Sequence, residues 1–410
     1  MATGPRIAHD LPIVELDNPA GFLRLAFEGG DVLAAAQAQI EQGQAADDPI
    51  VALMNLGLLY QLVGEKEAAL RCQMTGLATH RLFRHAAPPA AGPPLRLLAV
   101  VTPGDLMANT PLELMLEGRN VEIMKLYVLA GEPLPEAVPD HDVAIVAVGE
   151  TDRERTLLAA LDGWTADWPR PLLNRPARIL SLARDRLYRV LDGAPGILIP
   201  PTTRAGAADL AEAAAGRLDL ERLLPGGRYP LIVRPVGSHA GKGLEKVDDP
   251  EALGAYLAAA QAETYYLSRF IDYRGADGHF TKSRIAVFDG APHLAHLAAG
   301  DQWMVHYMNA GMAESEAKRR IEAAAMAGFD QDFARRHAEA FATMHARLGL
   351  EYFAIDCAET ADGALFVFEA DVAMIVHALD PEDLYPYKKP QMRKVFDAFE
   401  AMLRAAAGAG

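Results

Sequence analysis

A glycine-rich segment follows an apolar strand in the second half of the chain. The strand is predicted over 229–236 and carries Arg234, and the segment after it, 237–243, contains three glycines, Ser238 and Lys242. Glycine lets the backbone approach a phosphate closely, and successive backbone amides form an anion-binding nest. The segment therefore indicates a phosphate-binding loop, and a glycine-rich hairpin that only reverses the chain is the alternative. Its three glycines are Gly237, Gly241 and Gly243.

Three carboxylates stand close to one another in the sequence near its end. Asp356 lies in an apolar strand predicted over 352–360, and Glu369 and Asp371 lie in and just after a second strand, 364–370. An Asp-Gly turn joins the strands into a hairpin, and residues two apart point to the same face of a sheet. Three carboxylates repel one another unless a cation lies among them, and hard oxygen ligands suit Mg²⁺ together with substrate phosphates. The hairpin thus predicts a magnesium site, and three solvated hairpin residues are the alternative.

The elements that must position these residues change character along the chain. Residues 17–86 are expected to be helical, because apolar residues recur at helical spacing, and they resemble tetratricopeptide repeats. A plain helical hairpin is the alternative. Four prolines within 85–94 predict a linker. Strands and helices then alternate over 95–178, which predicts an α/β domain with a doubly wound parallel sheet.

Composition limits the classes of function. The chain has 410 residues, with 39 basic and 55 acidic side chains and a net charge of −16. This charge argues against partners such as nucleic acid or an anionic membrane. No apolar run approaches the roughly 20 residues of a membrane-spanning helix, and the first residues lack the apolar stretch of a secretory signal. The two cysteines, Cys72 and Cys357, cannot build a disulfide framework. A cytoplasmic location is therefore expected.

The glycine-rich loop followed by the acidic strands resembles the ATP-grasp superfamily. The resemblance covers roughly 95–405 and is nearest to the branch of glutathione synthetase and the ribosomal-protein glutamate ligases. It implies two ATP-grasp subdomains, 179–266 and 267–405, that clamp ATP after the α/β domain. It also implies a carboxylate–amine ligase, in which ATP phosphorylates a carboxylate and an amine attacks the acyl phosphate to give an amide, ADP and phosphate.

The resemblance assigns roles to individual residues. Arg284 matches an arginine that stabilises the transferred phosphate, and Lys242 is expected to act with it in catalysis. Asp356, Glu369 and Asp371 match the magnesium ligands, which are usually Asp, Glu and Asn. The remaining matches form the ATP-binding set of two arginines, the loop and a hinge strand that pairs with adenine: Arg186, Arg234, Gly237, Ser238, Gly241, Lys242, Gly243, Ser268, Phe270 and Ile271.

The acceptor end of the site departs further from the family pattern. The small-residue stretch that usually follows the metal ligands is here Val-Ala-Met-Ile-Val-His377. Residues 301–311 mix aromatic and polar side chains, including Trp303, His306 and Asn309, as expected for a pocket wall that contacts an amino-acid or peptide substrate. A loop packed by its aromatic residues is the alternative. His239 and His279 are, with His306 and His377, candidates for a base by location alone.

Several alternatives stay open at this point. A kinase of the same superfamily and a catalytically inactive nucleotide-binding scaffold compete with the ligase. The helical repeats suggest a peptide or protein partner, and a homodimer is a further partner to consider.

Overall fold

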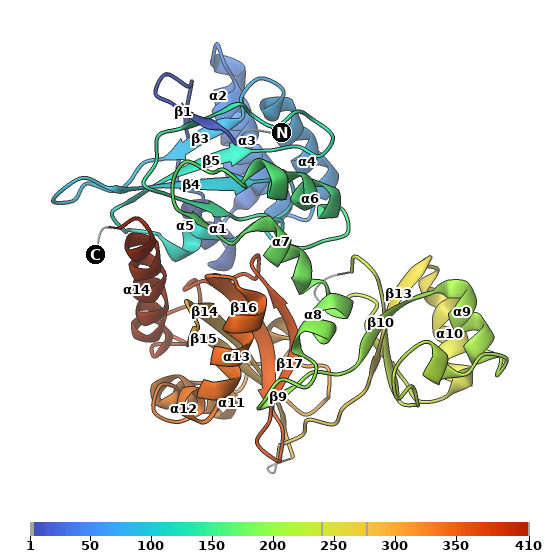
Figure 1. Ribbon diagram of the computed structural model, residues 1–410. Coiled ribbons are helices and arrows are strands. Elements are labelled where there is room, and N and C mark those ends of the chain that lie inside the picture. Colours follow the sequence, from blue (N-terminus) through green and yellow to red (C-terminus); the bar gives the residue numbers. More distant parts are fainter. Residues whose placement is uncertain (1–3, 239–240, 276–277, 409–410) are drawn as a thin grey trace. The chain divides into compact units, whose positions relative to one another are not determined.

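Four β-sheets and the helices beside them organise the residues that the computed structural model describes, which are 4–238, 241–275 and 278–408 (Figure 1). Contacts divide the chain into two units. The first comprises the chain up to Leu180, residues 350–353 and the chain from Asp371 onward, and the second comprises 181–349 and 354–370. The mixed α/β class predicted from the sequence is confirmed.

The first unit is built on a six-stranded sheet in the order β2-β3-β5-β4-β7-β8. Its central strand β4 pairs in parallel with β5 and β7, as the alternation of strands and helices predicted. Residues 97–101 of β4 are almost entirely buried, which is typical of a parallel strand covered on both faces. The strands are β2 (Val14–Glu15), β3 (Leu82–His85), β4 (Leu95–Val101), β5 (Val121–Tyr127), β7 (Val143–Val146) and β8 (Leu172–Leu173). A separate pair joins β1 (Arg6–Ala8) to β6 (Ala137–Pro139).

Helices expected over the N-terminal segment are present, but they end earlier than predicted. Leu82–His85, expected to be helical, forms strand β3 and pairs antiparallel with β5. Burial of Leu82 and Phe83 in the sheet outweighs any local helical preference. The side chains of Gln61 and Gln73 also bond the backbone oxygen of Gly104, at 2.9 and 3.0 Å, so the helices are tied to the loop after β4. The segment is therefore part of the first unit, and its resemblance to tetratricopeptide repeats stays a prediction.

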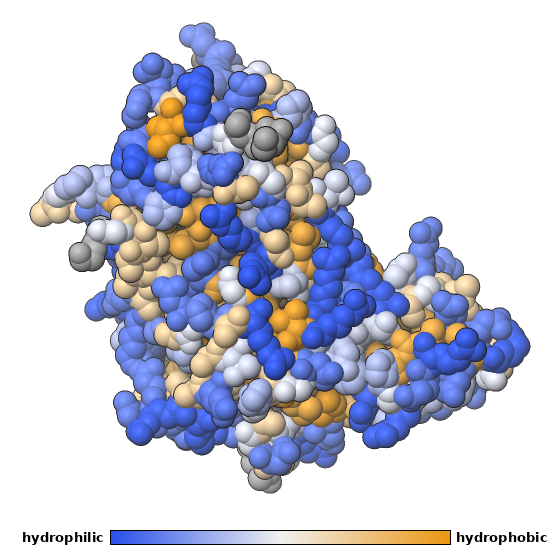
Figure 2. Space-filling view, in the orientation of Figure 1, coloured by the Kyte–Doolittle hydropathy of each residue, from blue (hydrophilic) through white to orange (hydrophobic). Residues whose placement is uncertain are grey.

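The helices of the first unit are α1 (Ala20–Phe27), α2 (Val32–Ala45), α3 (Ile50–Leu62), α4 (Lys66–Leu77), α5 (Leu112–Met115), α6 (Arg155–Trp164), α7 (Pro176–Ile179) and α14 (Lys388–Ala406). None of the helices in the described residues has the length and apolar character that crossing a membrane requires. Hydrophilic residues are spread widely over the visible surface (Figure 2), as expected for a chain with 23% charged residues.

The second unit contains two sheets. The smaller is antiparallel, with the order β10-β13-β11-β12, and the larger has the order β15-β14-β16-β17-β9. Strands β16 and β17 are neighbours, and their connection closes through a bond from Thr360 N to Ala364 O of 3.1 Å, with Gly363 at φ +83°. This is the hairpin that the Asp-Gly turn predicted.

The strands of the smaller sheet are β10 (Thr202–Gly206), β11 (Leu231–Pro235), β12 (Glu245–Val247) and β13 (Thr264–Arg269). Those of the larger sheet are β9 (Ile197–Leu198), β14 (Phe280–Phe288), β15 (Ala291–Gly300), β16 (Tyr352–Glu359) and β17 (Leu365–Asp371). The helices are α8 (Arg184–Leu191), α9 (Ala207–Ala214), α10 (Pro250–Ala260), α11 (Glu316–Gly328), α12 (Phe333–Arg336) and α13 (Ala338–Leu348).

Candidate functional site

The smaller sheet of the second unit has one apolar and one polar face. Ala205, Tyr265 and Val233 belong to a buried cluster that also includes residues of α9 and α10. Side chains alternate along a strand, so the neighbours of these residues lie on the opposite face. There, Arg204, Tyr266 and Arg234 are opposite one another on β10, β13 and β11. A second row on this polar face contains Thr202, Ser268, Ile232 and Lys246.

Arg234 is a buried cation that contacts the start of the glycine-rich loop. It is 8% exposed, its Nε donates to Ser238 Oγ at 3.2 Å, and its Nη2 donates to the Ser238 carbonyl oxygen. Burial lowers the pKa of Arg234 to about 10, and the nearby charge of Arg184 acts in the same direction. Among the described residues no carboxylate lies within ion-pair distance of Arg234.

The loop backbone requires glycine at its ends. Gly237 and Gly243 have φ values of +79° and +67°, and a Cβ at Gly243 would lie 2.9 Å from Pro235 Cδ. Gly241 also has a positive φ, +73°, and Lys242 beside it is exposed. His239, a candidate base, lies outside the described residues. The described ends of the loop thus present backbone and a lysine, and not bulky side chains, to their surroundings.

Asp356 on β16 is held by two cations from the neighbouring strand β14. Arg284 donates from Nε to Oδ1 at 2.8 Å and from Nη2 to Oδ2 at 3.0 Å, while Lys282 Nζ lies 2.6 Å from Oδ2. Asp356 is only 1% exposed. Burial alone would raise the pKa of Asp356, but the charges and hydrogen bonds of Arg284 and Lys282 hold it well below the ordinary value. The carboxylate therefore stays ionised.

Glu369 on β17 forms an ion pair with Arg184 at the start of α8. Burial would raise the pKa of Glu369, and the nearby Asp356 charge acts in the same sense. The charge of Arg184, helped by Lys282 and Arg234, outweighs both and lowers it. The charges of Glu369 and of Arg234, which lie on different sheets of the second unit, each act on the pKa of the other. We call Arg184, Arg234, Lys282, Arg284, Asp356 and Glu369 the cationic cluster.

Asp371 has a different environment at the end of β17. Its Oδ1 accepts from the backbone N–H of Ala373 at 3.1 Å and of Glu150 at 3.5 Å. The part of the chain that the structure describes contains no group of three or more His, Cys, Asp or Glu side chains arranged to hold a metal ion. The three carboxylates predicted as magnesium ligands are thus not brought together as such a group. The donor set does not fit a metal ion held by the protein alone, because cationic side chains already bind both oxygens of Asp356 and one of Glu369.

The predicted hinge residues lie at the edge of the polar face. Ser268 Oγ is 2.8 Å from Thr202 Oγ1, and the backbone N–H of Phe270 donates to Pro230 O at 3.2 Å. The Phe270 ring lies edge-on to Trp303, with centroids 5.9 Å apart, and Lys246 Nζ lies 4.9 Å from its centroid. Two further predicted ligands, Ile271 and Arg186, are half-buried, Ile271 against a hydrophobic cluster and Arg186 on α8.

A cavity of about 650 Å³ adjoins the predicted acceptor segment. Trp303 and Asn309 both line it. His306 lies near the cationic cluster, since burial and then the charges of Lys282 and Arg284 lower its pKa, so its ring is neutral at pH 7. His377 belongs to the first unit, where its Nδ1 accepts from Leu379 N at 3.1 Å. The other polar residues lining the cavity are Glu245, Lys246, Asp301, Gln302 and Lys318.

Two cations of this region, Lys282 and Arg204, were not singled out from the sequence. Lys282 lies two residues before Arg284 on β14, which begins at Phe280. The apolar pattern of the sequence predicts this strand only over 283–288, so Lys282 falls one residue before it. Arg204 bonds Asp185 at 3.0 Å and Tyr266 Oη at 2.6 Å. The alternation of Lys282 with Arg284 was the available signal, since both must share a face once the strand is extended by one residue.

Comparisons with known proteins give likenesses to solved structures only. No family model matches the chain, and no curated protein matches it. A RimK domain ATP-grasp protein from Sphaerobacter thermophilus is similar at 20% identity, over 76% of this chain and 99% of that one, with a TM-score of 0.41. The D-alanine–D-alanine ligase from Bacillus anthracis, solved with ATP, is similar at 15% identity, over 77% of this chain and 99% of that one, with a TM-score of 0.42. D-alanyl-alanine synthetase A from Vibrio cholerae is similar at 9% identity, over 78% of this chain and 100% of that one, with a TM-score of 0.47.

Proposed function

We propose that the chain is an ATP-dependent carboxylate–amine ligase acting on an amino acid or peptide. The observation that carries the proposal is buried Arg234, which has no carboxylate partner among the described residues. A buried cation is costly unless an anion compensates it. The cationic cluster as a whole has four cations and two carboxylates, a net charge of +2 within a chain of −16. A polyphosphate supplies the missing negative charge.

In this proposal the polar face of the smaller sheet and the glycine-rich loop bind the phosphates and the base of the nucleotide. Backbone amides of the glycine-rich loop and the side chains of Arg234 and Lys242 bind phosphate oxygens in this proposal. The row that contains Ile232, Ser268 and Lys246, continued by Phe270, offers apolar and polar groups to a purine base in this proposal. Each of these residues lies in the second unit.

The reaction that fits this site has two steps. The carboxylate of one substrate attacks the γ-phosphorus of ATP and ADP leaves. The amine of the second substrate then attacks the acyl carbon and phosphate leaves. In this proposal Arg284 neutralises charge on the transferred phosphoryl group. In this proposal His306, whose pKa is lowered by burial, accepts the proton that the amine loses.

The cavity beside Trp303 is proposed to hold the acceptor. Its lining combines an aromatic ring, the Asn309 amide, the lysines 246 and 318 and the carboxylates of Glu245 and Asp301. These groups complement both ends of a zwitterion, which favours an amino acid or a peptide end as the acceptor.

The test is a product analysis with the full chain. Purified protein is incubated with magnesium, ATP and pools of amino acids or peptides, and ADP, phosphate and products are measured. The proposal expects one pool to raise ADP and phosphate release in equal amounts, with loss of this release in Arg284→Gln. Arg217→Gln, on an exposed pair with Glu212, is the control and keeps the activity.

Two outcomes would contradict the ligase. A phosphorylated product without free phosphate would assign a kinase, and nucleotide binding without ADP release from any pool would assign a scaffold.

A further inference from the structure

Both carboxylate oxygens of Asp356 have cationic partners. Arg284 donates from Nε to Oδ1 at 2.8 Å and from Nη2 to Oδ2 at 3.0 Å. Lys282 Nζ also lies 2.6 Å from Oδ2. The three side chains come from neighbouring strands of one sheet, β14 and β16, and β16 places Asp356 in its buried interior. The arrangement is therefore part of the sheet and does not depend on a mobile loop.

The alternation of β14 explains why two cations reach one carboxylate. Lys282 and Arg284 are two residues apart, so both side chains project from the same face of the strand. The irregularity of β14 falls between Arg284 and Ile285, after both residues, and leaves this spacing intact. Lys282 is 19% exposed along its side chain, and its Nζ lies 5.9 Å from the ring centroid of Phe368 on β17.

A divalent ion would compete directly with Lys282. A magnesium ion binds a carboxylate oxygen at about 2.0–2.1 Å. The ammonium nitrogen lies 2.6 Å from the same Oδ2, so the two cations would share one place on that oxygen. The lysine ammonium is a compact point charge, unlike the planar fork of Arg284, and is the closer match to an ion.

We propose that the ammonium group of Lys282, which shares Asp356 with Arg284, fills the place of a divalent metal ion in the nucleotide-free protein. The free protein then holds no divalent ion at this carboxylate. The proposal concerns the protein without nucleotide, so it does not depend on which reaction the site performs.

The test measures Mn²⁺ binding to the full chain without nucleotide, by electron paramagnetic resonance of the free ion. The wild-type protein is expected to bind no Mn²⁺ at Asp356. Lys282→Gln removes the charge and is expected to gain a Mn²⁺ site at least tenfold tighter than any weak binding of the wild type, and the double variant Lys282→Gln/Asp356→Asn is expected to lose this site. Lys282→Arg keeps a cation and should behave as wild type, as should Lys389→Gln, an exposed lysine paired with Glu382.

Three results would overturn the proposal. These are wild-type binding as tight as that of Lys282→Gln, a gain that survives in the double variant, and no gain in a folded Lys282→Gln protein. If Lys282→Gln does not fold, Lys282→Met carries the same test. Crystals of the nucleotide-free wild type soaked in Mn²⁺ decide it independently, because anomalous density at the Asp356 carboxylate contradicts the proposal and its absence there supports it. Failure of the ligase assay would leave these outcomes unchanged.

Discussion

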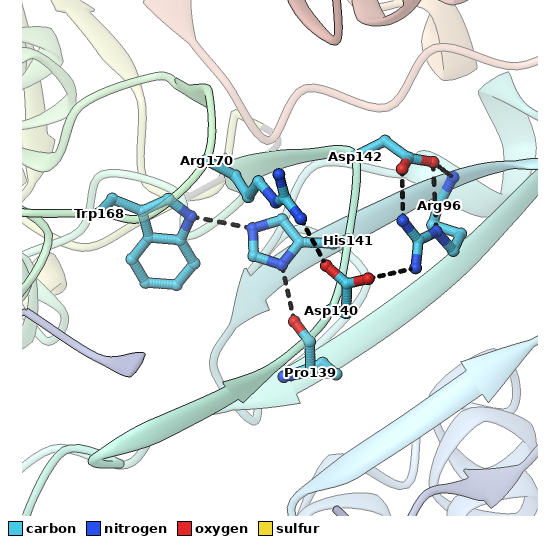
Figure 3. Close-up of polar contacts among 7 residues, drawn as sticks. All are labelled: Arg96, Pro139, Asp140, His141, Asp142, Trp168 and Arg170. Carbon is cyan, nitrogen blue, oxygen red and sulfur yellow. Dashed lines mark hydrogen bonds and ion pairs between the residues drawn. The ribbon is translucent and has the colours of Figure 1, made fainter. Parts of the chain in front are cut away.

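Two polar clusters, one in each unit, differ in how their charges are balanced. In the first unit, Arg96 binds Asp142 at 2.6 Å and Asp140 at 2.8 Å, and Arg170 binds Asp140 at 3.0 Å (Figure 3). Two arginines thus face two aspartates. The cationic cluster of the second unit instead has four cations for two carboxylates.

Both ring nitrogens of His141, which lies between Asp140 and Asp142 in the sequence of the first cluster, also have hydrogen-bond partners. His141 is fully buried, its Nδ1 lies 2.8 Å from Pro139 O, and Trp168 Nε1 donates to its Nε2 at 3.1 Å (Figure 3). Because the indole N–H can only donate, Nε2 accepts and Nδ1 carries the proton. The hydrogen bonds of Arg96, Arg170, His141 and Trp168 described here all join a donor to an acceptor. The charges of the first cluster therefore balance one another, whereas the second cluster has a surplus of two positive charges.

Asp356→Asn should give the largest change, because it leaves Lys282 and Arg284 buried without their carboxylate. Breaking a buried pair by removing one partner costs about 3–5 kcal/mol. We expect the free energy of unfolding, measured in denaturant, to fall by this amount. The double variant with Lys282→Gln should recover part of the loss. A single variant within about 1 kcal/mol of wild type would show that the cluster is as solvated as a surface pair.

Arg234→Met should separate stability from binding. The substitution removes a buried cation that lacks a carboxylate partner, so the free energy of unfolding should stay constant or rise. Affinity for ATP should fall by about 1.5–3 kcal/mol, the usual contribution of a hydrogen bond to a charged group. Calorimetry and denaturation on the same preparation check both. Lower stability together with unchanged ATP affinity would make Arg234 a structural residue.

Part of this site could be predicted from the sequence because it is local. Arg234 and Ser238 are four residues apart, and a strand running into glycines implies their proximity. The contact of Arg284 with Asp356 is different, because it requires β14 and β16 to be neighbours in a sheet, and strand order is not written in any local pattern. Lys282 was missed for a smaller reason, since strand ends are the least certain part of a pattern.

In the fold, too, local features were predicted from the sequence and features that depend on strand pairing were not. Periodic apolar residues correctly predicted the N-terminal helices, and the buried run of β4 predicted its strand. Strand β3 was missed, because four residues are too few to show a period and its pairing with β5 decides its structure. Asp371 was expected beside Glu369 by its spacing, but its carboxylate caps the backbone of Ala373 where the strand ends.

His141 should make the first cluster sensitive to acid. Burial lowers the pKa of His141 below 6.5, so the unfolded chain takes up the proton first and stability falls as the pH drops below about 6.5. His141→Gln keeps a donor and an acceptor without titrating. We expect the loss of unfolding free energy between pH 7.5 and 5.5 to shrink by roughly 1 kcal/mol in this variant. His9→Gln, at an exposed position, is the control, and an equal effect there would contradict the assignment.

Asp142→Asn should give the smallest change. Asp142 and Arg96 have side chains 31% and 36% exposed, and pairs of this kind contribute about 0.2–1 kcal/mol. Denaturation should therefore show a loss several times smaller than that of Asp356→Asn. Losses of equal size would remove the distinction between the two clusters.

The most direct test of the account is calorimetric titration of the wild-type chain with ATP, AMP and adenosine in magnesium buffer. If the surplus charge of the cationic cluster serves a polyphosphate, affinity should rise with each phosphate, and ATP should bind at least about tenfold more tightly than AMP. Equal affinities for ATP and adenosine, or no binding of ATP, would contradict the central claim that this charge is reserved for a nucleotide.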